Sequence, residues 1–101
     1  MLFAFSVAPT VSDTADGSVS EAVAAAVRVV RESGLPNETT AMFTTIEGEW
    51  DEVMPVIKAA CDAVARFSPR VSLVLKADLR PGYEGQLAAK VERVEEHLGH
   101  A

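Results

Sequence analysis

Two segments near the start decide the fold: LFAFSVAP at residues 2–9 and SVSEAVAAAVRVVRESG at residues 18–34. The first mixes aromatic and β-branched residues and ends at a proline, which predicts a strand over 2–8. The second repeats apolar residues three and four positions apart and ends at Gly34, which predicts a helix. Ser18 and Glu21 have the spacing of a capping box at its start. The chain therefore opens with a strand and a helix.

A hairpin and a second helix are expected next. Residues 38–42 and 43–49 are rich in Thr, with Phe and Ile, and are interpreted as two short strands. Asp51 is expected to cap the second helix, which begins near residue 53 and ends before the Ser-Pro pair at 68–69. Pro55 then falls in the first turn, where a missing amide costs little.

The last third of the chain predicts one more strand and one more helix. Residues 71–78 alternate between two faces, as a strand does. Residues 84–98 are expected to form a helix whose apolar stripe consists of Leu87, Val91, Val94 and Leu98.

This order of elements predicts an α+β fold, with the whole chain, residues 1–101, as a single ferredoxin-like domain. Its βαββαβ core has a four-stranded antiparallel sheet with two helices on one face, followed by an extra C-terminal helix. The crossover rule places strands one and four, or one and three, at the centre. If Phe3, Phe5 and Val7 face the helices, the other face is mixed: solvated, stacked on a second sheet, or holding a polar ligand.

Composition excludes several classes of protein. Fifteen acidic against nine basic residues in 101 give a net charge of −6 and a pI near 4.8, which disfavours binding to nucleic acid. The single cysteine, Cys61, allows no internal disulfide and is interpreted as a small buried apolar residue. The apolar start of the chain lacks a basic flank, and no segment reaches the roughly 18 apolar residues of a membrane span. We therefore expect a cytoplasmic protein with no membrane partner.

The chemical inventory predicts neither catalysis nor a metal site. His97 and His100 are the only histidines and both lie near the C-terminus, whereas zinc sites need three or four ligands. Without a positioned histidine base, a serine or cysteine nucleophile is not activated. The sequence therefore predicts no catalytic residue, no metal and no bound cofactor.

Three polar features remain as candidates for binding. The loop at 16–20 leads into a helix N-terminus, where capping alone explains Ser18. Glu47 lies at a strand end and could face a cation. Lys76, Asp78 and Arg80 share one parity, so they could bind a small molecule or fix a subunit contact.

Several segments together resemble the YkoF-like thiamine-binding protein family over nearly the whole chain. In order they are SVAP at 6–9, GSVS at 17–20, SGL at 33–35, MFTTIEGE at 42–49, DEVM at 51–54 and KADLR at 76–80. The resemblance implies the same ferredoxin-like fold. It also implies a small binding protein, not an enzyme, associated with thiamine or its hydroxymethylpyrimidine moiety and assembled as a dimer or tetramer through its sheets.

The resemblance assigns site residues by matching motifs. The family's loop serines, its Thr-x-x-Glu-Gly segment and its Lys-x-Asp-x-Arg strand end correspond to Ser18, Ser20, Thr44, Glu47, Lys76, Asp78 and Arg80. Ser18, Ser20 and Thr44 would bond the pyrimidine ring, and Glu47 or Asp78 would accept from its amine. Phe43 stands where the family commonly has glycine, and Pro55 is also atypical.

The expected function is therefore non-catalytic binding of thiamine or hydroxymethylpyrimidine by a homo-oligomer. The alternative is a structural or regulatory oligomer with another ligand or none. In that case Lys76, Asp78 and Arg80 would be subunit contacts.

Overall fold

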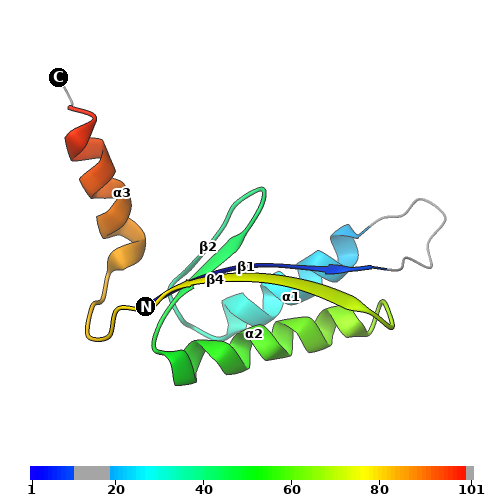
Figure 1. Cartoon of the computed structure of the whole chain (residues 1–101). Helices are drawn as coiled ribbons and strands as arrows, with labels where there is room; N and C mark the ends of the chain where they lie inside the picture. The colour runs from blue at the N-terminus through cyan, green and yellow to red at the C-terminus, as the bar shows by residue number, and fades with distance from the viewer. Residues whose placement is uncertain (11–18, 100–101) are drawn as a thin grey trace.

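A four-stranded sheet and three helices make up residues 1–10 and 19–99, the part of the chain that this computed structural model describes (Figure 1). In chain order the elements are β1 (Leu2–Pro9), α1 (Ser20–Glu32), β2 (Asn37–Thr39), β3 (Thr44–Glu47), α2 (Trp50–Ala65), β4 (Val71–Asp78) and α3 (Gln86–His97). This order confirms the predicted ferredoxin-like βαββαβ arrangement with an extra C-terminal helix.

The strands lie in the order β2-β3-β1-β4 and every pairing is antiparallel. Strands one and three are therefore central, which settles the alternative that the crossover rule left open. β1 pairs with β4 over its whole length, from Leu2 to Pro9, but with β3 only from Leu2 to Phe5. The hairpin of β2 and β3 is shorter than predicted, because its strands cover only 37–39 and 44–47.

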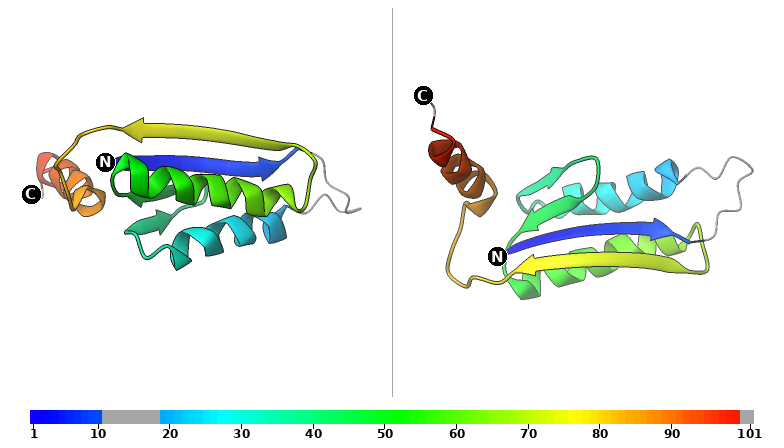
Figure 2. Two further views of the ribbon diagram at one scale, coloured as in Figure 1. Left: turned by 90° about the horizontal axis from the view of Figure 1, so that it is seen from below. Right: turned by 45° about the horizontal axis from the view of Figure 1, so that its top comes forward.

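The core lies between one face of the sheet and the helices α1 and α2, which run side by side beneath it (Figure 2). Alternate β1 residues point into it, as predicted: Phe3, Phe5 and Val7 are buried. Ile46 of β3 and Ile57 of α2 are also buried, and Phe3 meets the ring of Trp50 edge-on at 6.0 Å. The opposite, open face of the sheet is covered by neither of these helices.

The second helix begins earlier than predicted. α2 starts at Trp50, with Glu49 at the N-cap position in place of Asp51, and the Glu49 amide donates to the Glu52 carboxylate at 3.0 Å. Glu52 can accept this hydrogen bond because it lies three residues after the N-cap residue, which is the spacing of a capping box. Pro55 consequently lies inside the helix and removes one backbone hydrogen bond there.

The first helix begins at Ser20, with Val19 at its N-cap and no side-chain cap. The predicted capping residue Ser18 lies outside the described residues. The stop at Gly34 agrees with the prediction, because this glycine has a φ of +77°.

α3 differs from the other helices because it projects from the end of the sheet, away from α1 and α2 (Figures 1 and 2). Of its twelve residues only Gln86 is buried. Val91 and Val94 of the predicted apolar stripe are each 58% exposed, and Leu98 is 74% exposed. The stripe therefore does not contribute to the core of this chain.

Candidate functional site

The predicted site residues fall into two groups at different places on the sheet. Thr44 is the first residue of β3 and Glu47 the last, so they are separated by about 10 Å at roughly 3.3 Å per residue. Thr44 pairs with Phe5 on the helix side, whereas Glu47 pairs with Leu2, which belongs to the open face. One chain therefore does not bring all the predicted residues to a single pocket.

The first group lies at a cavity of about 170 Å³ between β1, α1 and the β2–β3 hairpin. Thr44 lines this cavity and is only 7% exposed. Among the described residues, the Thr44 hydroxyl has no hydrogen-bond partner. The other walls are Phe5–Ala8 of β1, Val23, Ala26 and Val27 of α1, and residues 39–43.

Ser20 lies at the end of the helix row that faces this cavity. Positions 20, 23 and 27 of α1 share one face because residues three and four apart on a helix are neighbours. Val23 and Val27 line the cavity, and Ser20 is exposed one turn before them. Ser18 lies outside the described residues.

Phe43 shapes the cavity without filling it. Phe43 is 36% exposed and contributes to the wall, and the 170 Å³ of space remains beside it. Thr40 holds the hairpin turn, because its hydroxyl donates to the Phe43 carbonyl at 3.1 Å and its amide donates to the same carbonyl at 2.9 Å.

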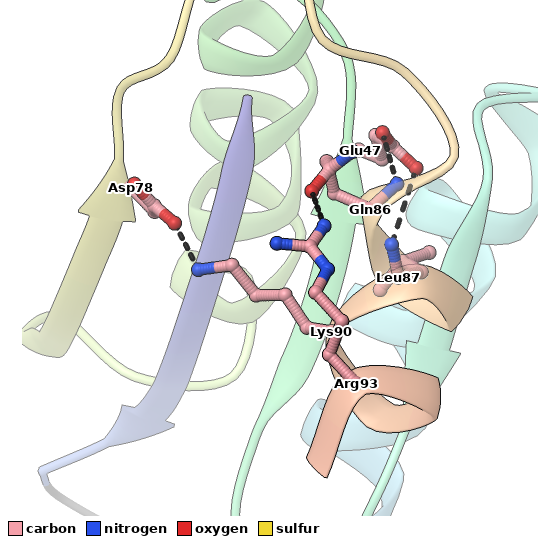
Figure 3. Close-up of polar contacts among 6 residues, drawn as sticks. All are labelled: Glu47, Asp78, Gln86, Leu87, Lys90 and Arg93. Carbon is pink, nitrogen blue, oxygen red and sulfur yellow. Dashed lines mark hydrogen bonds and ion pairs between the residues drawn. The ribbon is translucent and has the colours of Figure 1, made fainter. Parts of the chain in front are cut away.

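Glu47 holds the base of α3 (Figure 3). Its carboxylate accepts hydrogen bonds from the amides of Gln86 at 2.9 Å and Leu87 at 3.5 Å. Glu47 itself is only 7% exposed. A carboxylate is favourable there because the first amides of a helix lack partners within the helix and carry partial positive charge.

Lys76, Asp78 and Arg80 lie on or just after β4. Asp78 pairs with Lys90 of α3, whose hydrogen bond and charge hold the pKa of Asp78 below its usual value (Figure 3). Arg80 stacks on the ring of Tyr83 at 3.5 Å from its centroid. Lys76 pairs in register with Ala4 on the open face.

A second cavity of about 480 Å³ lies beside this group, at the base of α3. The residues that line it include four with carboxylates, Glu47, Glu49, Glu52 and Glu84, together with Tyr83 and Leu87. Three of these carboxylates belong to caps already described: Glu47 for α3, and Glu49 with Glu52 for α2.

Gln86, Lys90 and Arg93 belong to the polar contacts of α3 but were missed from the sequence. The Arg93 guanidinium donates to the Gln86 side chain at 2.8 Å (Figure 3). A local signal did exist, because Gly85 stands at the N-cap of α3 and offers no side-chain acceptor. Such a helix needs an acceptor from elsewhere in the chain, but the sequence does not identify it as Glu47.

The described residues offer little reactive chemistry. They contain no group of three His, Cys, Asp or Glu side chains that could hold a metal ion. Partial burial raises the pKa of the Cys61 thiol, with a further contribution from Asp62, which disfavours the nucleophilic thiolate. In the same part of the chain, no helix is both long and apolar enough to cross a bilayer.

The fold is that of a small α+β domain with two cavities, and sequence comparison identifies its family. Residues 3–95 match the family model described as thiamine-binding protein. A UPF0045 protein of Mycobacterium bovis is 52% identical over 99 residues, covering 97% of this chain and 94% of the relative. The chain belongs to the thiamine-binding protein family, as the resemblance in its sequence predicted.

Solved structures share the fold. A hypothetical protein from Methanocaldococcus jannaschii is 33% identical and superposes with a TM-score of 0.81, over 94% of this chain and 95% of that one. A protein from Thermotoga maritima, named as a candidate for thiamine biosynthesis or salvage, is 26% identical with a TM-score of 0.73. That match covers 95% of this chain and 96% of the other.

Proposed function

We propose that this protein binds thiamine or its hydroxymethylpyrimidine moiety without catalysing a reaction, and that it does so as a homo-oligomer in the cytoplasm. Family membership and the name of the Thermotoga relative support the ligand class. The observation that carries the proposal is the cavity beside Thr44.

The Thr44 cavity suits a small heteroaromatic ring. Its walls are largely apolar, from Val23, Val27 and Phe43, while the Thr44 hydroxyl supplies one donor and acceptor. Small-molecule sites commonly combine apolar walls with a few fixed polar groups. Ser20, which the resemblance also assigns to the ligand, stands one turn before Val23 on the same helix row.

Absence of catalysis is proposed from the chemistry of the site. The cavity wall contains no Asp, Glu, His, Cys, Lys or Arg among the described residues. Proton transfer at a bound ring needs a positioned acid or base. The carboxylate of Glu47 lies on the other face of the sheet and is occupied by α3.

Self-association is proposed from apolar surface that one chain leaves uncovered. Val91 and Val94 of α3 and Leu98 directly after it are exposed, and so are Val74 and Leu79 on and after β4. Exposed apolar side chains on one helix face are common at protein contacts. Lys76, Asp78 and Arg80 stay predicted as ligand residues, and subunit contact is their alternative role.

Calorimetric titration with thiamine, thiamine phosphate and hydroxymethylpyrimidine tests the binding proposal. We expect saturable binding of the pyrimidine compound. The Thr44→Val substitution should weaken it by about two- to twelvefold, because a net hydrogen bond contributes about 0.5–1.5 kcal/mol. Thr45→Val is the matched control, since Thr45 pairs with Ala4, which faces away from the cavity.

No heat at millimolar concentration of any of the three compounds would overturn the binding proposal. Equal effects of Thr44→Val and Thr45→Val would overturn its assignment to this cavity. The alternative, an oligomer with another ligand or none, predicts the first of these outcomes together with an intact assembly.

Sedimentation equilibrium tests self-association. We expect a mass that is a multiple of the 10.7 kDa chain. Val94→Ser should lower the measured mass, whereas Glu95→Ser, the next residue along the same helix, should leave it unchanged. A wild-type mass of one chain at every concentration would overturn this part of the proposal.

A further inference from the structure

The central strand β1 has a free edge beside the Thr44 cavity. β4 pairs with all eight residues of β1, but β3 pairs only with Leu2–Phe5. Beyond Phe5 the hairpin turns away, and no described strand pairs with Ser6–Pro9 on that side. Ser6, Val7 and Ala8 line the cavity at this place.

Two hydrogen bonds show which main-chain groups point to the free edge. The Gly48 amide donates to the Met1 carbonyl at 3.1 Å on the β3 side. The Thr10 amide donates to the Arg70 carbonyl at 3.0 Å on the β4 side. Successive residues of a strand direct their N–H and C=O groups to opposite sides. Odd-numbered residues of β1 therefore face β3, and Val7 faces the space where β3 is absent.

Val7 thus presents a donor and an acceptor side by side to the cavity. Its side chain points into the core and the residue is only 7% exposed. No hydrogen bond to the Val7 main chain on this side comes from the described part of the chain. Buried peptide groups almost always have partners, so a ligand that offers an acceptor next to a donor would complete this edge.

The volume of the cavity suits the entry of one ring of a ligand. An apolar protein cavity of about 150 Å³ is known to hold benzene. The 170 Å³ beside Val7 therefore accommodates a single six-membered ring with small substituents. A ring nitrogen adjacent to an exocyclic amine has the acceptor–donor pattern that matches an N–H next to a C=O.

We propose that the main-chain N–H and C=O of Val7 recognise the amidine edge of a single aminopyrimidine ring. The Val7 N–H donates to the ring nitrogen and the amine donates to the Val7 C=O. This inference rests on the proposed function and adds to it a mode of recognition. The edge of β1 forms hydrogen bonds with the amine and the adjacent ring nitrogen, while Thr44 and the apolar walls contact the rest of the ring.

Amide NMR on the full-length, ¹⁵N-labelled protein tests the inference without altering the site. On addition of hydroxymethylpyrimidine we expect the Val7 amide proton to shift downfield and to exchange more slowly. The Ala8 amide is the internal control, because it points toward β4 and pairs there. An analogue in which methyl replaces the amine should bind at least about tenfold more weakly, since it leaves the Val7 carbonyl buried without a partner.

The outcomes separate this inference from the proposed function. Binding with a shifted Val7 amide and rejection of the amine-free analogue supports both. Binding that leaves the Val7 amide unchanged, or equal affinity for the two compounds, overturns the recognition by Val7 and leaves the proposed function standing. If no pyrimidine compound binds, both fail.

Discussion

The body of the molecule and α3 are held in place by different physical forces. The sheet, α1 and α2 enclose apolar side chains such as Phe3, Ile46 and Ile57, which are almost wholly removed from water. α3 buries only Gln86 and meets the body through the Glu47 carboxylate and the Lys90–Asp78 ion pair. Since apolar burial is the larger source of stability, α3 should open at lower free energy than the body.

This difference also separates the two proposed roles, ligand binding and self-association. The walls of the Thr44 cavity that come from β1 and α1 belong to the packed body, whereas residues 39–43 are exposed and lie at the hairpin turn. The apolar stripe of α3 lies on the element that its own chain buries least, with Val91 and Val94 each 58% exposed.

The largest expected effect comes from truncating the core of the body. Phe3→Ala should lower the free energy of unfolding by about 3–5 kcal/mol, because it removes a fully buried ring and leaves a cavity. Urea denaturation followed by circular dichroism measures it. Phe67→Ala is the matched control and should cost clearly less, since Phe67 is 36% exposed. Equal costs would contradict this account of the core.

The next effect comes from the close approach of Gly48 to α2. A Cβ at position 48 would lie 2.9 Å from Cγ2 of Val53, which is fully buried and has no room to move. Gly48→Ala should therefore cost about 1–3 kcal/mol through overpacking. Urea denaturation of the single and double variants with Val53→Ala checks the cause.

Relief of overpacking in the double variant is the decisive observation. If the clash is responsible, the two substitutions together should cost less than the sum of their separate costs. Simple additivity would mean that Gly48 acts through its backbone and not through contact with Val53.

The sequence predicts a structural feature well when that feature depends on residues close together in the chain. Alternation in β1 predicted its buried face, because it follows directly from strand geometry. The helical repeat of α1 was confirmed only in part: Ala22, Ala26 and Val30 are buried, but Val19 and Val23 of the same repeat are exposed. The same periodicity predicted α3 and its stripe, but not that the stripe stays outside the core. Periodicity shows that a helix has an apolar face and does not show what covers that face.

The sequence indicated individual candidate residues of the site, but not which of them the fold brings together. The motif match drew attention to Thr44 and Glu47, and strand parity already places them on opposite faces. The partner of Glu47 lies 39 residues away at Gln86, a separation over which no local pattern operates. The free edge at Val7 depends on where β3 begins, and turn residues without a clear hairpin motif left that point open by several residues.

A smaller effect should follow from removing the cap of α3. Glu47→Ala leaves the amides of Gln86 and Leu87 without their acceptor. Loss of a helix cap typically costs about 0.5–2 kcal/mol. We expect this cost to appear as faster hydrogen exchange along α3, with exchange in the central strands nearly unchanged.

Glu49→Ala is the matched control for Glu47→Ala, because it removes the N-cap side chain of α2 and not that of α3. Its exchange effect should appear at the start of α2. If Glu47→Ala instead increased exchange throughout the sheet, α3 would be part of the cooperative body, and the contrast between the two regions would be wrong.

The smallest effect concerns the Asp78–Lys90 ion pair, whose side chains are both close to half exposed. Lys90 lowers the pKa of Asp78 in the folded protein. The pair therefore stabilises α3 above the unfolded pKa of about 3.9 and loses that contribution as the pH falls through the folded pKa. Asp78→Asn should shift the α3 amide resonances at pH 7, and its difference from the wild type should vanish at low pH. Asp62→Asn breaks a comparable exposed pair within α2 and should leave α3 unchanged, so a response of α3 to both variants would contradict the local role of Asp78.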